Sequence, residues 1–328
     1  MKIWCSIAVK PGRNVFLLGG LALGLIWPTA SASAATVLVP EQFPLIQMAI
    51  DVSVSGDTVS IAPGIYRGVG NRGIHFRGLD VVVKSREGPQ NTVLDCEMAD
   101  RGFYLDQAET RAARIEGITI LRGYATSGFG GSGGAILCGL SDVSIVDCRF
   151  LECRAASDGG ALALFVFSGI VEDCVISGCT AGWGGGISFW FGEAEIKDCV
   201  ITGNKAAYYA GGVCFGGQGG NRLSGCTVAA NSCDNFGGGI YAANPLLLER
   251  CIVWDNCAVS YGPEILCGEA DIRCSDIDTT GVFGVGVSYD ENCVFTDPLF
   301  CSPTSCELTI NGDWSLGANS SCLPEHSP

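Results

Sequence analysis

A five-fold repeat in the middle of the chain constrains the fold more than any other feature of the sequence. Each copy contains a glycine pair, a strand-like apolar run and then a cysteine. The copies run from Gly133-Gly134 to Cys148, Gly159-Gly160 to Cys174, Gly184-Gly185 to Cys199, Gly211-Gly212 to Cys226, and Gly237-Gly238 to Cys251. A repeat of about 25 residues indicates a solenoid, in which each unit buries its apolar side chains against its neighbours.

Apolar residues alternate with polar ones inside each copy, as at Ile145, Cys148 and Phe150, and Gly, Asn and Asp interrupt the runs. This pattern is typical of short strands joined by turns. The repeat is too short for paired helices and lacks the LxxLxL pattern of leucine-rich repeats. The sequence therefore predicts an all-β, parallel β-helix of about ten coils, with two or three short strands in each coil.

The first 34 residues are predicted to be a secretory signal peptide. A basic start with Lys2, Lys10 and Arg13 precedes a short apolar run and the small-x-small motif Ala32-Ser33-Ala34. The apolar run is too short to anchor the chain in a bilayer. We therefore expect a secreted protein that is extracellular, periplasmic or at the cell surface, with no membrane insertion.

The remaining chain is predicted to consist of a repeat array between two caps. Residues 35–55 form an N-terminal cap with a short helix, since Ile46, Ala49 and Ile50 share one helical face. Residues 56–280 form the β-helix. Residues 281–328, rich in Cys, Ser, Pro and Asp, form an irregular C-terminal cap.

The composition argues against nucleic-acid and membrane partners and against a zinc site. The formal net charge is −15, and the predicted leader holds three basic and no acidic residues, so the chain after it is more acidic still. Such a charge repels nucleic acid and anionic membrane surfaces. The 19 cysteines include no CxxC pair and stand beside only two histidines, which disfavours zinc. Disulfides or buried thiols are expected instead.

Two columns of equivalent residues suggest specific roles. Asp147, Asp173 and Asp198 each come directly before a repeat cysteine, and their stacked carboxylates could bind calcium, although Asp is also common in solvated turns. No other cofactor is predicted. Five residues after each repeat cysteine come Cys153, Cys179, Asn204, Asn231 and Asn256. We expect the asparagines to bond from coil to coil, and Cys153 and Cys179 are close enough to be candidates for a disulfide.

Aromatic residues supply the candidate binding site. Four rings fall near one another in register, at Phe165, Trp190, Phe215 and Tyr241, with Tyr208 and Tyr209 in an adjoining turn. They could form an exposed stripe that stacks on sugar rings. The alternative is that several of these rings pack under turns.

Several motifs resemble those of a known group of proteins. The opening of bacterial secreted right-handed parallel β-helix proteins resembles three segments here, Ile46–Asp51, Gly56–Val59 and Ala62–Tyr66. The ending of those proteins is similar to Asp297–Phe300. The Gly-Gly-Ala-Ile and Phe/Ile-x-x-Asn/Cys repeats resemble those of chlamydial polymorphic outer membrane proteins. The resemblance implies a right-handed, pectin-lyase-like β-helix. It leaves the activity open, because this fold includes lyases, hydrolases and adhesins.

Three functions remain open at this point. The favoured one is an exported, non-catalytic β-helix protein that binds glycans or protein partners. The second is a polysaccharide lyase or glycoside hydrolase, which the fold resemblance suggests. The third is a passive adhesin or surface scaffold. The outward positions predicted after the glycine pairs, such as Leu137, Ala163 and Ser188, carry no acid or base. No catalytic residue is therefore predicted.

Overall fold

The computed structural model describes residues 33–126, 129–302 and 313–316. The predicted signal peptide lies almost wholly outside these residues, as do Cys306 and Cys322 of the predicted C-terminal cap. The fold described below is that of the compact unit Ala34–Pro328.

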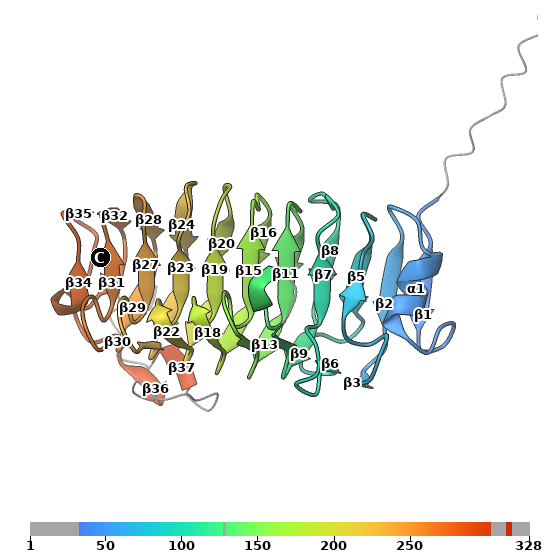
Figure 1. The fold of residues 1–328 in the computed structure, drawn as a ribbon. Coiled ribbons are helices and arrows are strands. Elements are labelled where there is room, and N and C mark those ends of the chain that lie inside the picture. The colour runs from blue at the N-terminus through green and yellow to red at the C-terminus, as the bar shows by residue number, and fades with distance from the viewer. Residues whose placement is uncertain (1–32, 127–128, 303–312, 317–328) are drawn as a thin grey trace, which may run out of the picture. The chain divides into compact units, whose positions relative to one another are not determined.

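Parallel strands stack coil upon coil into four sheets (Figure 1), so the prediction of an all-β parallel β-helix is confirmed. Sheet A contains β1 (Thr36–Val39), β2 (Thr58–Ile61), β5 (Val82–Ser85), β8 (Arg114–Glu116), β12 (Ser144–Val146), β16 (Ile170–Glu172), β20 (Glu195–Lys197), β24 (Asn221–Ser224), β28 (Leu246–Glu249), β32 (Glu269–Arg273) and β35 (Gly286–Tyr289). Sheet B contains β3 (Gly64–Tyr66), β6 (Thr92–Asp95), β9 (Thr119–Leu121), β13 (Arg149–Leu151), β17 (Val175–Ser177), β21 (Val200–Thr202), β25 (Thr227–Ala229), β29 (Ile252–Trp254) and β33 (Asp276–Ile277).

The other two sheets complete each coil. Sheet C contains β4 (Ile74–His75), β7 (Phe103–Leu105), β11 (Ile136–Gly139), β15 (Leu162–Phe165), β19 (Ile187–Phe189), β23 (Val213–Phe215), β27 (Ile240–Ala242), β31 (Ile265–Cys267) and β34 (Val282–Phe283). Sheet D contains β10 (Tyr124–Ala125), β14 (Arg154–Ala155), β18 (Thr180–Trp183), β22 (Lys205–Tyr209), β26 (Ser232–Cys233) and β30 (Cys257–Ala258). A coil runs through sheets A, B, D and C in that order, as in β12 to β15.

Short elements complete the description. The helix α1 spans Ile46–Val52, and Ile46, Ala49 and Ile50 are fully buried, as predicted. Two 3-10 turns span Phe129–Gly131 and Thr279–Gly281, and β36 (Phe300–Ser302) pairs antiparallel with β37 (Asp313–Leu316). The coils extend beyond the predicted limits, because β1 precedes the helix and β34 and β35 follow residue 280.

The core consists of inward side chains that stack in register along the solenoid. In sheet A one column contains Ile115, Ile145, Val171, Ile196, Leu223, Leu248 and Ile272, all fully buried. The repeat cysteines join this core as small apolar residues, since Cys148, Cys174, Cys199, Cys226 and Cys251 are at most 1% exposed. Each coil therefore depends on its neighbours for burial of its apolar surface.

Cys153 and Cys179, the candidates for a disulfide, are not joined in this structure. Both residues are buried free thiols. The sulfur of Cys153 lies 3.6 Å from the carbonyl oxygen of Ile120, and that of Cys179 lies 3.6 Å from the carbonyl oxygen of Phe150. Each thiol thus has a carbonyl oxygen of the preceding coil within range.

The asparagine ladder is confirmed. The side chain of Asn204 donates to Asn231 Oδ1 at 2.9 Å, and the side chain of Asn231 donates to Asn256 Oδ1 at 3.0 Å. The ladder ends at the buried Glu264, whose carboxylate oxygens accept from the backbone N–H of Asn256 at 3.0 Å and from its side-chain amide at 2.6 Å. Burial raises the pKa of Glu264 to about 8.

Candidate functional site

Three of the four predicted aromatic residues lie on the outer face of sheet C, and the fourth, Phe215, does not. Phe215 pairs with Phe189 and Ala242 and is fully buried in the core. The sequence interpretation aligned Gly212 with Gly185, whereas the register places Val213 opposite Ile187. One extra residue in this coil therefore moves Phe215 inward, because side chains alternate between the two faces of a strand.

The other predicted rings do face outward, in two separate columns. Phe165 and Trp190 occupy equivalent partly buried positions on β15 and just after β19. Trp190 is held in place, since its indole N–H donates to Asp158 Oδ1 at 2.9 Å and its ring covers Gly216, where an added Cβ would meet it at 2.9 Å. Tyr241 lies in the neighbouring column, next to Cys214 of the preceding coil.

A second set of rings lies where sheet D leads into sheet C, and the sequence interpretation had found only one of its members, Tyr209. Parallel bridges join Trp183 to Tyr209, Tyr209 to Phe236, and Phe236 to Tyr261. We call these four residues the aromatic column. Each lies directly before a residue with a left-handed backbone, at Gly184, Ala210, Gly237 and Gly262. The sequence signal was thus an aromatic residue directly before each left-handed turn that leads into sheet C.

Rings of the aromatic column stack on one another from coil to coil. The centroids of Trp183 and Tyr209 lie 4.6 Å apart, those of Tyr209 and Phe236 lie 5.4 Å apart, and those of Phe236 and Tyr261 lie 6.2 Å apart. Tyr241 meets Tyr209 at 4.6 Å with an interplanar angle of 52°. Stacked rings cover one another's faces, so the column presents ring edges outward, whereas Tyr241 packs against Tyr209 at a tilt and is not stacked in the column.

Beside the column lies a hollow of about 350 Å³, which we call the aromatic hollow. It is lined by Tyr209, Phe236, Tyr241, Ala242, Ala243, Leu266, Cys267 and Gly268. Within the described residues, the hydroxyls of Tyr209 and Tyr241 form no hydrogen bond to protein. Burial raises the pKa of Tyr241, so its phenol stays neutral. The hollow thus combines aromatic walls, small residues and polar groups that a ligand could engage.

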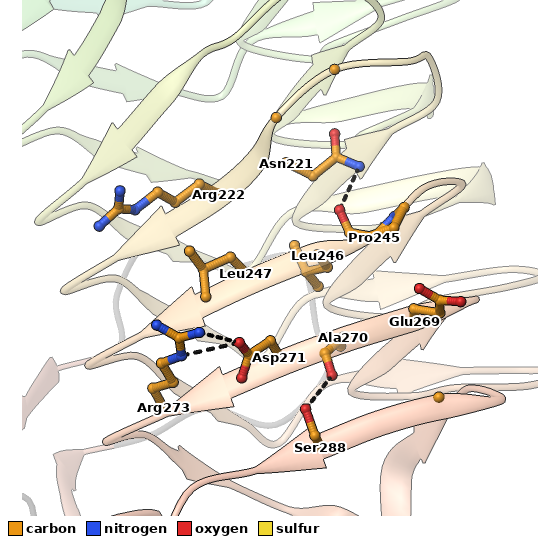
Figure 2. Close-up of a pocket in the computed structure, with 13 residues that line it drawn as sticks. Asn221, Arg222, Pro245, Leu246, Leu247, Glu269, Ala270, Asp271, Arg273 and Ser288 are labelled. Carbon is orange, nitrogen blue, oxygen red and sulfur yellow. Dashed lines mark hydrogen bonds and ion pairs between the residues drawn. The ribbon is translucent and has the colours of Figure 1, made fainter.

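A second hollow of about 610 Å³ lies on the outer face of sheet A (Figure 2). Leu247 of β28 lies between Arg222 of β24 and Asp271 of β32, and Arg273 lies two residues further along β32. We call this the sheet A hollow. Sequence reasoning missed it because the outward positions considered were those of another face of the coil.

The arginines of the sheet A hollow are already paired. Arg222 contacts Glu249 at 2.7 Å, and Arg273 Nε contacts Asp271 Oδ2 at 3.0 Å (Figure 2 draws the second pair). Glu269 also lines the hollow and forms no ion pair within the described residues. The pairs leave the arginines largely neutralised, so the hollow offers mixed charge rather than a strong single-sign field.

The three aspartates of the calcium hypothesis lie in register at the turn between sheets A and B. All three are exposed, and their φ angles are 49° at Asp147, 53° at Asp173 and 51° at Asp198. Asp tolerates this left-handed conformation better than most residues, which explains its presence there without a ligand. Across the described stretches, His, Cys, Asp and Glu side chains do not gather in any group of three or more that could hold a metal ion.

A family model supports the fold, and two solved structures are similar to the chain. Residues 66–228 match the family model of the right-handed β-helix region. A solved rhamnogalacturonan lyase is similar at 12% identity, covering 88% of this chain and 98% of its own, with a TM-score of 0.45. A rice weevil pectin methyl esterase is similar at 11% identity, covering 81% of this chain and 83% of its own, with a TM-score of 0.34. No curated protein matches the chain.

The stacked parallel sheets give this chain a parallel β-helix fold, and the match over residues 66–228 indicates that the helix is right-handed. In the described part of the chain, no helix has both the length and the apolar character needed to cross a membrane.

Proposed function

We propose that this protein is exported and binds glycans through the aromatic hollow without cutting them. The carrying observation is the hollow itself, which Tyr209 and Tyr241 line with phenol hydroxyls that form no hydrogen bond within the described residues. Sugar rings have apolar C–H faces that pack on aromatic rings, and hydroxyls that pair with phenols. The lining contains no carboxylate, histidine or lysine that could act as acid or base.

The test blocks each hollow separately. An added Cβ at Gly268, in the aromatic hollow, meets no atom within 4 Å, so Gly268→Leu fills the hollow without strain. Gly220→Leu is the matched control in the sheet A hollow, where the nearest atom to an added Cβ is Glu193 Cγ at 3.8 Å. The purified proteins are titrated with a panel of polysaccharides by calorimetry.

We expect Gly268→Leu and Tyr241→Ala to weaken binding by about tenfold or more, because each removes packing at the centre of the contact. Gly220→Leu and Tyr124→Ala, in sheet D away from the hollow, should bind like the wild type. Loss of binding in Gly220→Leu alone would overturn the assignment to the aromatic hollow. If no glycan of the panel binds and the protein binds a protein partner instead, the protein-binding form of the hypothesis is favoured.

A second candidate function is a polysaccharide lyase or glycoside hydrolase that uses the sheet A hollow. The observation that favours it is the gathering of Arg222, Asp271, Arg273 and Glu269 on one outer face. The same panel is therefore assayed for new reducing ends and for unsaturated ends. New ends that disappear in Asp271→Asn would replace the binding-only proposal. If the protein neither binds nor cuts any glycan or partner, a passive scaffold is the better account.

A further inference from the structure

The lining of the aromatic hollow indicates what kind of glycan fits it. None of its side chains carries a charge at neutral pH, since burial raises the pKa of the Cys267 thiol to about 11 and that of Tyr241 above its usual value. No arginine or lysine lines it to neutralise an anion. The chain as a whole is acidic, with a formal net charge of −15. An anionic polymer would therefore meet long-range repulsion and no local compensation.

The arrangement of rings also gives a direction. The hollow takes residues from successive coils, with Tyr209 from β22, Tyr241 from β27 and Leu266 from β31. Figure 1 shows β19, β23, β27, β31 and β34 side by side along the solenoid. Successive coils are about 4.8 Å apart. A chain lying along the axis would thus meet one new ring per coil, whereas a chain crossing the coils would leave the rings after one contact.

Further rings continue the hollow at both ends. Trp183 and Trp190 lie in the coil before Tyr209, with centroids 5.6 Å apart. Tyr261 and Phe283 follow, with centroids 5.9 Å apart, and are 58% and 43% exposed. Exposed rings beyond the hollow lengthen the contact only for a ligand that runs parallel to the solenoid axis.

We propose that the aromatic hollow binds an uncharged polysaccharide whose chain runs parallel to the solenoid axis. This inference rests on the proposed glycan binding. It assigns Tyr241 as the ring that stacks on a sugar, because the faces of Tyr209 and Phe236 are covered by their neighbours in the column. It assigns Tyr261 as an outer contact that only longer ligands reach.

The experiment measures affinity for series of oligosaccharides matched in length, from disaccharide to hexasaccharide. The neutral series are cello-oligosaccharides and manno-oligosaccharides, and the anionic series is oligogalacturonates. The proteins are wild type, Tyr241→Ala, Tyr261→Ala and the control Tyr124→Ala. We expect affinity for at least one neutral series to rise with length, and the anionic series to bind about tenfold more weakly or worse.

The variants separate direction from binding itself. Tyr241→Ala should weaken every neutral length, whereas Tyr261→Ala should weaken only the longer oligomers, by about three- to tenfold. Equal or tighter binding of the anionic series would overturn the uncharged ligand. A Tyr261→Ala effect that is the same at all lengths, or affinity that does not change with length, would overturn the axial direction. Either result leaves glycan binding standing, while failure of all oligomers and polysaccharides to bind would sink the proposed function.

Discussion

Trp183 and Tyr209 lie one coil apart with their ring centroids 4.6 Å apart and their planes inclined by only 24°. Neither ring belongs to the interior, since both stand at the outer junction of sheets D and C and remain partly exposed. Tyr209 in turn contacts Phe236 and Tyr241, so it joins the aromatic column to the ring of Tyr241. The same side chains therefore stabilise the stacking of coils and build the wall of the candidate binding site.

Removing the central ring should destabilise the protein measurably. Tyr209→Leu keeps an apolar side chain but loses three aromatic contacts, each of which contributes about 0.5–1.5 kcal/mol beyond its buried area. We expect a loss of about 1–3 kcal/mol in the free energy of unfolding, measured by urea denaturation. A double-mutant cycle with Trp183→Leu should show coupling between the two sites. Strict additivity would mean that the rings do not stabilise each other.

Asn231 should be among the most costly polar residues to remove. Its side chain donates to the carbonyl of Ile201 at 2.8 Å and to Asn256, while accepting from Asn204. Asn231→Ala leaves several of these buried groups without partners, at about 1–3 kcal/mol each. We expect a loss of about 3–5 kcal/mol in unfolding free energy. Cys179→Ala, in the same column, is the control and should cost about 1 kcal/mol, because the thiol bonds only weakly.

Glu264 should make stability fall as pH rises. In the folded protein its pKa is raised from 4.5 to about 8 by burial, so the folded state keeps a proton that the unfolded chain releases. Unfolding therefore releases a proton between about pH 4.5 and pH 8, and the free energy of unfolding decreases across that window. The stability difference between wild type and Glu264→Gln, followed by denaturation at several pH values, should decrease in the same window. A difference that is independent of pH would contradict this assignment.

The repeat cysteines should resist thiol reagents until the protein unfolds. Cys148 and Cys174 are almost fully buried, and burial raises the pKa of Cys174 well above its usual value. Cys274, in contrast, is exposed. Mass spectrometry after brief alkylation of the native protein should find label on Cys274 but not on the repeat column. Cys274→Ser is the control, and rapid labelling of Cys148 or Cys174 in the native state would contradict their burial.

Calcium is tested at Asp173, the middle aspartate of the turn column. Burial, together with Asp173 and Glu116, raises the pKa of Asp147, so neutralising Asp173 removes a repulsion. We expect Asp173→Asn to keep or slightly raise the unfolding midpoint at low salt, because Asn also tolerates the left-handed turn. We expect added calcium to leave the midpoint of wild type unchanged. A calcium-dependent rise that Asp173→Asn abolishes would instead establish a calcium site.

The repeat predicted the coil, because alternation and turn residues follow directly from strand geometry. The asparagine ladder was also predictable, since equal spacing in sequence places equivalent residues one above another. The face on which Phe215 lies was not predictable from the same spacing. A run of glycines hides which one begins the strand, and a slip of a single residue exchanges the core face for the outer face.

The aromatic column, of which only Tyr209 was noted from the sequence, could not be predicted for a different reason. Trp183, Tyr209, Phe236 and Tyr261 belong to no alternating run, because they precede the turn that leads into sheet C. Only the pairing of whole coils brings them together. The sheet A hollow likewise depends on how far apart the side chains of four coils stand, which no local pattern encodes.

The turn between sheets A and B has a consequence for how such a protein can change its length. Asp173, Gly225, Arg250 and Cys274 all adopt the same left-handed backbone there, so the turn closes a coil whatever side chain occupies it. An entire coil could therefore be duplicated or deleted in the gene without disturbing the pairing of the coils on either side. Each such event in the region of Trp183 to Tyr261 would add or remove one ring from the outer surface. The length of ligand that the protein binds would then change during evolution by one coil at a time. This change would be independent of the strength of any single contact.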